Sequence, residues 1–174
     1  MSADVTRLAN GLIIVTESTP HLETSALGVW VDAGARHERE DEHGLSHLLE
    51  HMAFKGTATR STQDIAEEIE AVGGELNAAT GLESTAYFAR VLKGDEGVAL
   101  GIVADILQNS TFADEELEKE REVILQEIAG TLDSPDDIAF DLVHDAAFPN
   151  QPAGRTILGT PKSVKSISRN KLKD

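Results

Sequence analysis

The spacing of apolar residues along this chain switches repeatedly between the two-residue period of a β-strand and the 3.6-residue period of an α-helix. Residues 24–33 (TSALGVWVDA) carry apolar side chains at every second position, which predicts a strand. Residues 45–54 (LSHLLEHMAF) instead place leucines and a methionine at helical spacing. A chain that mixes the two periods without a regular strand–helix–strand rhythm is typical of an α+β domain. We therefore expect a mostly antiparallel sheet packed against helices.

Turn and cap residues indicate where the other elements begin and end. Asn10-Gly11 is the strongest short signal for a hairpin, here between residues 5–8 and 12–17. Ser61 and Asp64 resemble a capping box, and Gly73-Gly74 ends the helix that this box opens. The remaining elements are expected in the following order: helix 61–72, strands 75–80 and 84–92, helix 96–108, helix 114–132, a helix starting at Ser134-Pro135 and a short helix starting at Thr160-Pro161.

Length and composition restrict the class of protein. The 174 residues suffice for one domain (1–174) with a sizeable core, and an apolar content of 40% excludes disorder. The net charge of −16 disfavours nucleic acid, because an acidic surface repels phosphates, and suits a basic partner. The absence of cysteine excludes thiol nucleophiles and thiolate metal sites. Neither a membrane span nor a targeting segment is recognisable, which predicts a cytoplasmic protein.

The chemistry is concentrated in residues 47–51, which read His-Leu-Leu-Glu-His. Residues four apart on a helix share one face, so His47 and His51 can hold one Zn²⁺ through two imidazoles. Glu50 lies close to that face, where it can take a proton from a water that the metal has activated. This combination is the minimum equipment for metal-assisted hydrolysis.

A catalytic zinc site needs a third protein ligand and an open fourth position. The acidic helix predicted over residues 114–132 offers several carboxylates, and helical geometry separates them. Glu118 and Glu122 fall opposite the apolar stripe, on the solvated side. Glu120 and Glu127 fall at the margin of the stripe, where a carboxylate needs a partner that offsets its desolvation. A metal and its ligand histidine would be suitable partners.

The other histidines have no such context. His43 also precedes His47 by four residues, but that pair would leave no carboxylate beside the water. We interpret His43 as a solvated neighbour at the start of the helix. The remaining three have no partner at ligand spacing and are interpreted as residues without a role in the site: His21, His37 and His144.

Four sequence blocks, in a fixed order, extend a family resemblance beyond the histidine motif. They read GLSHLLEHMAFKGT, EAVGGELNAATGLESTAYFARV, EREVILQEI and ILGTPKSVKSIS. With the H-x-x-E-H order, they resemble the inverted-zincin peptidases, the group of pitrilysin, insulin-degrading enzyme and mitochondrial processing peptidase. Within this group the chain looks most like bacterial relatives of the processing peptidase β subunit. The resemblance covers nearly the whole chain from Leu8 onward and implies the fold of the family's N-terminal domain.

This resemblance implies a zinc endopeptidase and gives each matching residue a role. His47, His51 and Glu127 match the three ligands of a single zinc ion. Glu50 matches the general base. Glu120 matches the family's second essential glutamate, which supports the site from behind the ligands. The helix-face argument selects the same two glutamates of residues 114–132.

The resemblance also implies a substrate and a partner. Asn77, Ala78, Ala79 and Thr80 match the edge strand along which the family binds extended peptides. The acidic charge fits basic peptides such as presequences. The family's enzymes close two homologous halves around the substrate. Residues 1–174 match the first half without its usual final strand, so this domain is expected to be incomplete at its C-terminal end and the second half to be absent from these residues. The implied partner is therefore a second half, in the same chain or a separate subunit, and the first half alone is expected to be weakly active or inactive and to self-associate.

Two other classes of protein share parts of this pattern. The S-ribosylhomocysteine lyases also carry H-x-x-E-H, but they require cysteine, and this chain has none. Some members of the peptidase family are non-catalytic scaffold or assembly subunits. Such subunits usually lose the zinc motif, whereas here each of its residues is present.

Overall fold

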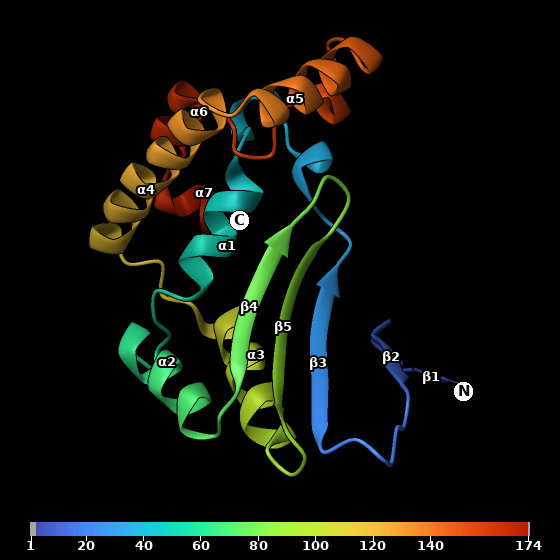
Figure 1. Ribbon diagram of the computed structural model, residues 1–174. Coiled ribbons are helices and arrows are strands. Elements are labelled where there is room, and N and C mark those ends of the chain that lie inside the picture. Colours follow the sequence, from blue (N-terminus) through green and yellow to red (C-terminus); the bar gives the residue numbers. More distant parts are fainter. Residues whose placement is uncertain (1–2, 174) are drawn as a thin grey trace.

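A three-stranded antiparallel sheet forms the centre of the computed structural model, which describes residues 3–173 (Figure 1). β3 (Thr24–Val31) and β4 (Glu75–Thr80) both pair with β5 (Thr85–Leu92), so the strand order is β3-β5-β4. Alternate residues of β5 are buried against the helices, as a half-buried strand requires. β4 is left as an edge strand of this sheet.

The N-terminal hairpin forms a separate two-stranded sheet. β1 (Asp4–Arg7) pairs antiparallel with β2 (Ile13–Thr16) around the predicted turn, in which Gly11 has a φ of 93°. The Asn10 side-chain oxygen accepts a hydrogen bond from the Leu12 amide, which closes the turn. All residues of both strands are exposed. A hollow of about 1420 Å³ is lined by β2 and by parts of the larger sheet and its helices.

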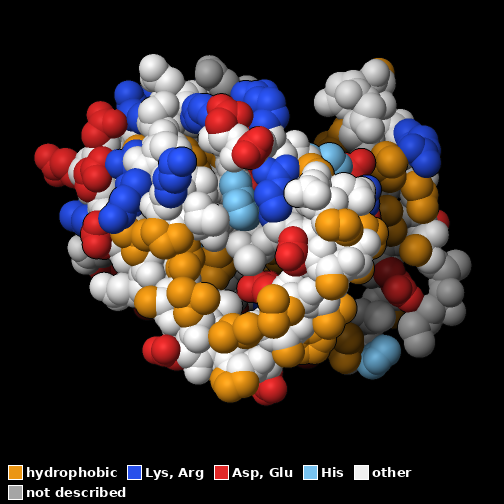
Figure 2. All heavy atoms as spheres, turned by 90° about the horizontal axis from the view of Figure 1, so that it is seen from above, with side chains coloured by type: hydrophobic (Ala, Val, Ile, Leu, Met, Phe, Trp, Pro, Cys, Tyr) orange, Lys and Arg blue, Asp and Glu red, His pale blue; other side chains and the backbone are white. Residues whose placement is uncertain are grey.

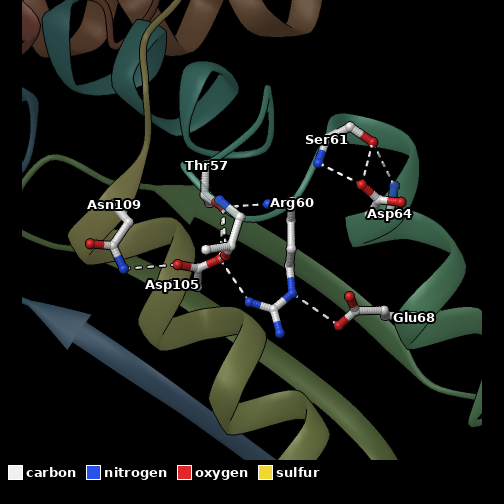
Figure 3. A network of polar contacts seen from close by, with 8 residues as sticks. Thr57, Arg60, Ser61, Asp64, Glu68, Asp105 and Asn109 are labelled. Atoms are coloured by element: carbon white, nitrogen blue, oxygen red, sulfur yellow. Dashed lines mark hydrogen bonds and ion pairs between the residues drawn. The ribbon is translucent and has the colours of Figure 1, made fainter.

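Two helices cover one face of the sheet and close the first hydrophobic core. α2 (Thr62–Ala71) begins with the predicted capping box: Ser61 Oγ accepts a hydrogen bond from the Asp64 amide, and the Asp64 carboxylate accepts one from the Ser61 amide (Figure 3). α3 (Glu96–Asn109) packs against β3 and β5. The buried residues of this core are Ala53, Ile65, Ile69, Ala78, Tyr87, Ala89, Val91, Ala99, Ile102, Val103 and Ile106.

A second core lies among helices only. α1 (Leu45–Ala53) packs against α4 (Asp114–Leu132), and α4 in turn contacts α6 (Pro161–Ser166). α7 (Arg169–Lys173) contributes Leu172. The buried residues of this core are Leu48, Met52, Leu117, Ile124, Ile128, Val164, Ile167 and Leu172. Because Ala53 belongs to the first core, α1 joins the two cores and is held on both sides.

The start of α1 is fixed by a buried carboxylate from the preceding loop. This loop contains two short 3₁₀ helices, η1 (Ala35–His37) and η2 (Glu40–Glu42). Glu38, between them, accepts hydrogen bonds from the amides of Gly44 at 2.9 Å and Ser46 at 2.6 Å. These amides are among those that the first turn of a helix leaves unpaired. Glu38 therefore caps α1 in place of a side chain at Gly44.

The C-terminal part of the chain packs against this same start. Gly44 has a φ of 92°, and a Cβ there would lie 2.7 Å from the Leu158 carbonyl oxygen, so the site requires glycine. His43 is half-buried, and its Nε2 lies 2.8 Å from the Thr156 carbonyl oxygen. The interpretation of His43 as a solvated neighbour was therefore wrong, because the loop that follows η3 (Pro152–Gly154) covers it.

α5 (Pro135–Ala147) stands apart from both cores. None of its residues is buried, and Phe140, Leu142 and Val143 are largely exposed, Phe140 to 69%. Figure 2 looks onto the end of the molecule at which Figure 1 shows α5. In that view, hydrophobic side chains form a band across the lower part of the surface. Exposed apolar patches of this kind mark contact surfaces. Within residues 3–173, no helix is long and apolar enough to cross a membrane.

The observed elements confirm the α+β prediction, with bounds shifted by at most two residues. The predicted strand over residues 24–33 ends at Val31, and the helix predicted over 96–108 extends to Asn109. Ser134 stands at the predicted N-cap of α5 but makes no capping hydrogen bond with its side chain. The sequence reasoning did not predict the three 3₁₀ helices or α7.

Candidate metal centre

Two histidines of α1 and one glutamate of α4 converge on a single point. His47 and His51 lie on consecutive turns with ring centroids 4.6 Å apart. Glu127 Oε2 lies 3.6 Å from His47 Nε2 and 3.7 Å from His51 Nε2. Within residues 3–173 this is the one group of three such side chains whose ligand atoms all lie within 4.8 Å of one another.

The protonation of His47 suits a metal ligand. Burial, together with the neighbouring His51, lowers the pKa of His47 to about 4, so the imidazole is neutral at pH 7. Its Nδ1 is buried and has no hydrogen-bond partner within the described part of the chain. The ring nitrogen that faces Glu127 is therefore Nε2. A neutral imidazole offers the free lone pair that a metal ion requires.

The spacing of the three groups fits zinc. Ligand atoms at 2.0–2.1 Å from a tetrahedral zinc are about 3.3–3.5 Å apart, close to the separations observed here. Nitrogen and carboxylate oxygen are donors that zinc accepts. Glu127 keeps 40% of its side chain exposed, so the cluster opens towards solvent on the side of α4.

Glu120 lies about two turns before Glu127 on α4 and contacts the other ring nitrogen of His51. Its Oε2 is 3.0 Å from His51 Nδ1, and its Oε1 is 2.7 Å from the Lys55 ammonium. Only 7% of the Glu120 side chain is exposed. Because a carboxylate accepts hydrogen bonds, this contact places the His51 proton on Nδ1 and leaves Nε2 free to face Glu127.

Glu50 is held by the edge strand. Thr80 Oγ1, on β4, donates a hydrogen bond to Glu50 Oε2 and also approaches the Ser46 carbonyl oxygen at 3.4 Å. Burial and the charge of Glu50 raise the pKa of Tyr87, on β5, to about 12. Glu50 is not one of the three clustered ligands. It adjoins His51 in the sequence and is orientated by the Thr80 hydroxyl group.

The structure brings together most of the residues singled out from the sequence. His47, His51 and Glu127 converge on one point, Glu120 contacts His51, and the Thr80 side chain contacts Glu50. Asn77, Ala78 and Ala79 lie further along β4; the Asn77 side-chain oxygen accepts a hydrogen bond from the Ala78 amide.

Other residues fall outside the centre or were missed. His21, His37, His43 and His144 are not part of the cluster. The sequence reasoning missed Lys55, which stands only four residues after His51. Its position four residues after the motif was the one available signal, because its partner Glu120 is on a helix distant in sequence.

An H-x-x-E-H helix beside a glutamate from a second helix, within an α+β domain, is the arrangement of the inverted zincins. The chain matches the insulinase family, peptidase family M16, over residues 13–161 and belongs to that family. This confirms the resemblance inferred from the sequence blocks.

Two relatives illustrate the match. An uncharacterized zinc protease of Rickettsia bellii is 47% identical over 167 residues, which are 96% of this chain and 40% of that protein. The probable β subunit of the mitochondrial processing peptidase of Arabidopsis thaliana is 46% identical over 170 residues, 98% of this chain and 32% of that protein. The chain thus spans two fifths or less of the length of these relatives.

Solved structures share the fold. The crystal structure of a peptidase M16 inactive domain from Pseudomonas fluorescens superposes with a TM-score of 0.92 at 19% identity, over 99% of this chain and 42% of that one. At this identity the likeness shows the fold alone. It confirms the architecture predicted from the sequence.

Proposed function

We propose that residues 1–174 form the zinc-bearing part of a metalloendopeptidase that hydrolyses unfolded or extended peptides. The observation that carries this proposal is the convergence of His47, His51 and Glu127 with Glu50 beside them. Zinc, when bound by the three ligands, supplies a Lewis acid that polarises the peptide carbonyl and lowers the pKa of the attacking water.

The chain's own residues perform the proton transfer. Glu50 takes the proton of the attacking water and delivers it to the leaving amine. Thr80 donates to one oxygen of this carboxylate and so limits its rotation. Glu120 holds His51 through Nδ1, which keeps the ligand nitrogen pointed at the site.

The free edge of β4 is the proposed binding strand for the substrate. β4 pairs on one side with β5, and its carboxyl end reaches Glu50 through Thr80. An extended peptide that added to residues 77–80 would therefore pass beside the base. Main-chain pairing of this kind gives affinity without a demand for sequence. The net charge of −16 favours basic peptides such as presequences.

The proposed activity belongs to a longer protein or to a complex with a second homologous half. The relatives are more than twice as long as the matched segment, and α5 exposes an apolar surface of the kind that marks interfaces. A non-catalytic scaffold subunit is the alternative function. The complete set of ligands and base favours the enzyme.

The proposal is tested with a chimera that joins residues 1–174 to the rest of the Rickettsia bellii zinc protease. The chimera should cleave unfolded basic peptides, and residues 1–174 alone should do so feebly or not at all. Glu50→Gln in the chimera should keep the zinc and lower cleavage by about 10²–10⁴-fold, the usual contribution of a general base. A zinc-loaded chimera without cleavage would favour the scaffold function, and loss of zinc in the variant would make Glu50 a ligand.

A further inference from the structure

Lys55 and Glu120 form a largely buried ion pair directly behind a candidate zinc ligand. Lys55 follows the last turn of α1, where its amide donates to the Met52 carbonyl oxygen at 3.2 Å. From there its ammonium group reaches Glu120 Oε1 on α4 at 2.7 Å. The pair therefore joins the end of the histidine helix to the helix that carries Glu127.

The Glu120 carboxylate needs this partner. Burying an ionised carboxylate without a countercharge is costly, and the side chain is only 7% exposed. Its two oxygens have distinct partners, His51 Nδ1 on one and Lys55 on the other. Without the ammonium group, the carboxylate would turn towards solvent, and this would weaken its acceptor contact with His51.

The position of the His51 proton depends on that contact. A neutral imidazole carries its proton on one nitrogen, and the hydrogen bond made by that nitrogen selects which. Glu120 selects Nδ1, and Nε2 then points with a free lone pair towards Glu127. If the proton moved to Nε2, the lone pair would be directed away from His47 and Glu127.

We propose that Lys55 is a positioning residue of the metal centre: it holds Glu120 against His51 so that His51 presents an unprotonated Nε2 to the ion. This proposal rests on the proposed zinc site. The contacts of the Lys55–Glu120 pair distinguish it from an ordinary surface ion pair. Lys119 and Glu116, on the same α4, are 2.6 Å apart, but that lysine is largely exposed and touches neither histidine. It provides a matched control.

The first test reads the tautomer in the metal-free protein. Nitrogen-15 NMR of histidine-labelled protein at pH 8 reports which nitrogen carries the proton, and a His51→Gln variant assigns the signals. The wild-type protein and Lys119→Met should show His51 protonated on Nδ1. Lys55→Met should shift His51 towards the Nε2–H form, and Lys55→Arg should restore the Nδ1–H form. An Nδ1–H signal in Lys55→Met equal to that of the wild type would overturn the proposal.

The second test reads the affinity for zinc by competition with a chelator. Lys55→Met should bind zinc about 10–100-fold more weakly, the usual effect of mutating a residue that supports a metal ligand. Lys119→Met should stay within about twofold of the wild-type affinity. Lys55→Gln replaces Lys55→Met if the latter does not fold. Equal affinity in the wild type and the Lys55 variant would overturn the proposal. A wild-type protein that shows the Nδ1–H tautomer but binds no zinc would instead overturn the proposed function.

Discussion

Two polar clusters, one formed by the loop that leaves α1 together with α3 and one formed by α1 and α4, differ in whether their polar atoms are paired. In the first, Asp105 of α3 accepts hydrogen bonds from the side chains of Thr57, Thr59, Arg60 and Asn109, and Arg60 also pairs with Glu68 (Figure 3). In the second, Glu127 Oε2 lies 3.6 Å from His47 Nε2 and 3.7 Å from His51 Nε2, without a hydrogen bond to either.

The effect of burial on each cluster shows the difference. Burial alone would raise the pKa of Asp105, but the hydrogen bonds from Thr57, Asn109, Arg60 and Thr59 outweigh it and lower the pKa to about 2. Burial lowers the pKa of His47 to about 4, and within residues 3–173 no hydrogen-bond acceptor at Nδ1 offsets this effect. The Asp105 cluster is complete without any ligand and fixes the loop. The histidine cluster leaves lone pairs directed at one point, which is the property of a metal site.

The largest effect that separates the two clusters is on stability. Asp105→Asn removes a charged acceptor with four donors, and hydrogen bonds to charged groups contribute about 1.5–3 kcal/mol each. Because the variant keeps one acceptor oxygen, we expect the free energy of unfolding to fall by about 1.5–3 kcal/mol in a urea titration, with zinc affinity unchanged. Glu75→Gln, which breaks an exposed pair with Arg90, is the control and should change stability by less than about 0.5 kcal/mol. Equal stability of Asp105→Asn and the wild type would contradict this role.

A smaller effect is expected at the hydroxyl group that touches the base. Thr80→Val in the chimera removes the hydrogen bond to Glu50 while keeping the shape of the side chain. One hydrogen bond contributes about 0.5–1.5 kcal/mol, so kcat should fall about two- to tenfold, with zinc content unchanged. Thr80→Ser should restore most of the rate. A loss confined to KM would show that Thr80 acts through substrate binding instead.

The Asp105 contribution to stability should also depend on pH. The pKa of Asp105 in the folded chain, about 2, lies below its ordinary value of 3.8. The unfolded chain therefore takes up the proton first as the pH falls, and stability due to this carboxylate is present above about pH 4 and lost between about pH 4 and 2. The stability difference between the wild type and Asp105→Asn should shrink across that window. A difference that stays constant from pH 6 to pH 2 would refute this explanation.

The local part of the fold and site could be predicted from the sequence. Hairpin, caps and helix faces depend on residues close together in the chain, so Asn10-Gly11 and the Ser61–Asp64 box gave correct element starts. The His47–His51 pair depends on helical spacing alone. Helix faces also separated Glu120 and Glu127 from their solvated neighbours, and the resemblance assigned them to the site.

Contacts between distant elements could not be predicted. The Lys55–Glu120 pair and the Thr80–Glu50 hydrogen bond join residues on different elements, and no local pattern marks them. Thr80 was selected for its backbone, whereas its side chain makes the contact. His43 was misplaced for the same reason, because the Thr156 carbonyl that covers it arrives from the far end of the chain.

The binding of zinc by His47, His51 and Glu127 is tested most directly by titrating zinc into the wild-type chain, Glu127→Gln and Glu118→Gln in competition with a chelator. Glu118 lies on the same helix with 71% of its side chain exposed, which makes it the matched control. The wild type and Glu118→Gln should each bind one zinc ion per chain with the same affinity. Glu127→Gln should bind zinc about 10–100-fold more weakly or worse, since even the loss of a residue that only contacts a metal ligand reaches that range. Equal affinity of Glu127→Gln and the wild type would contradict the assignment.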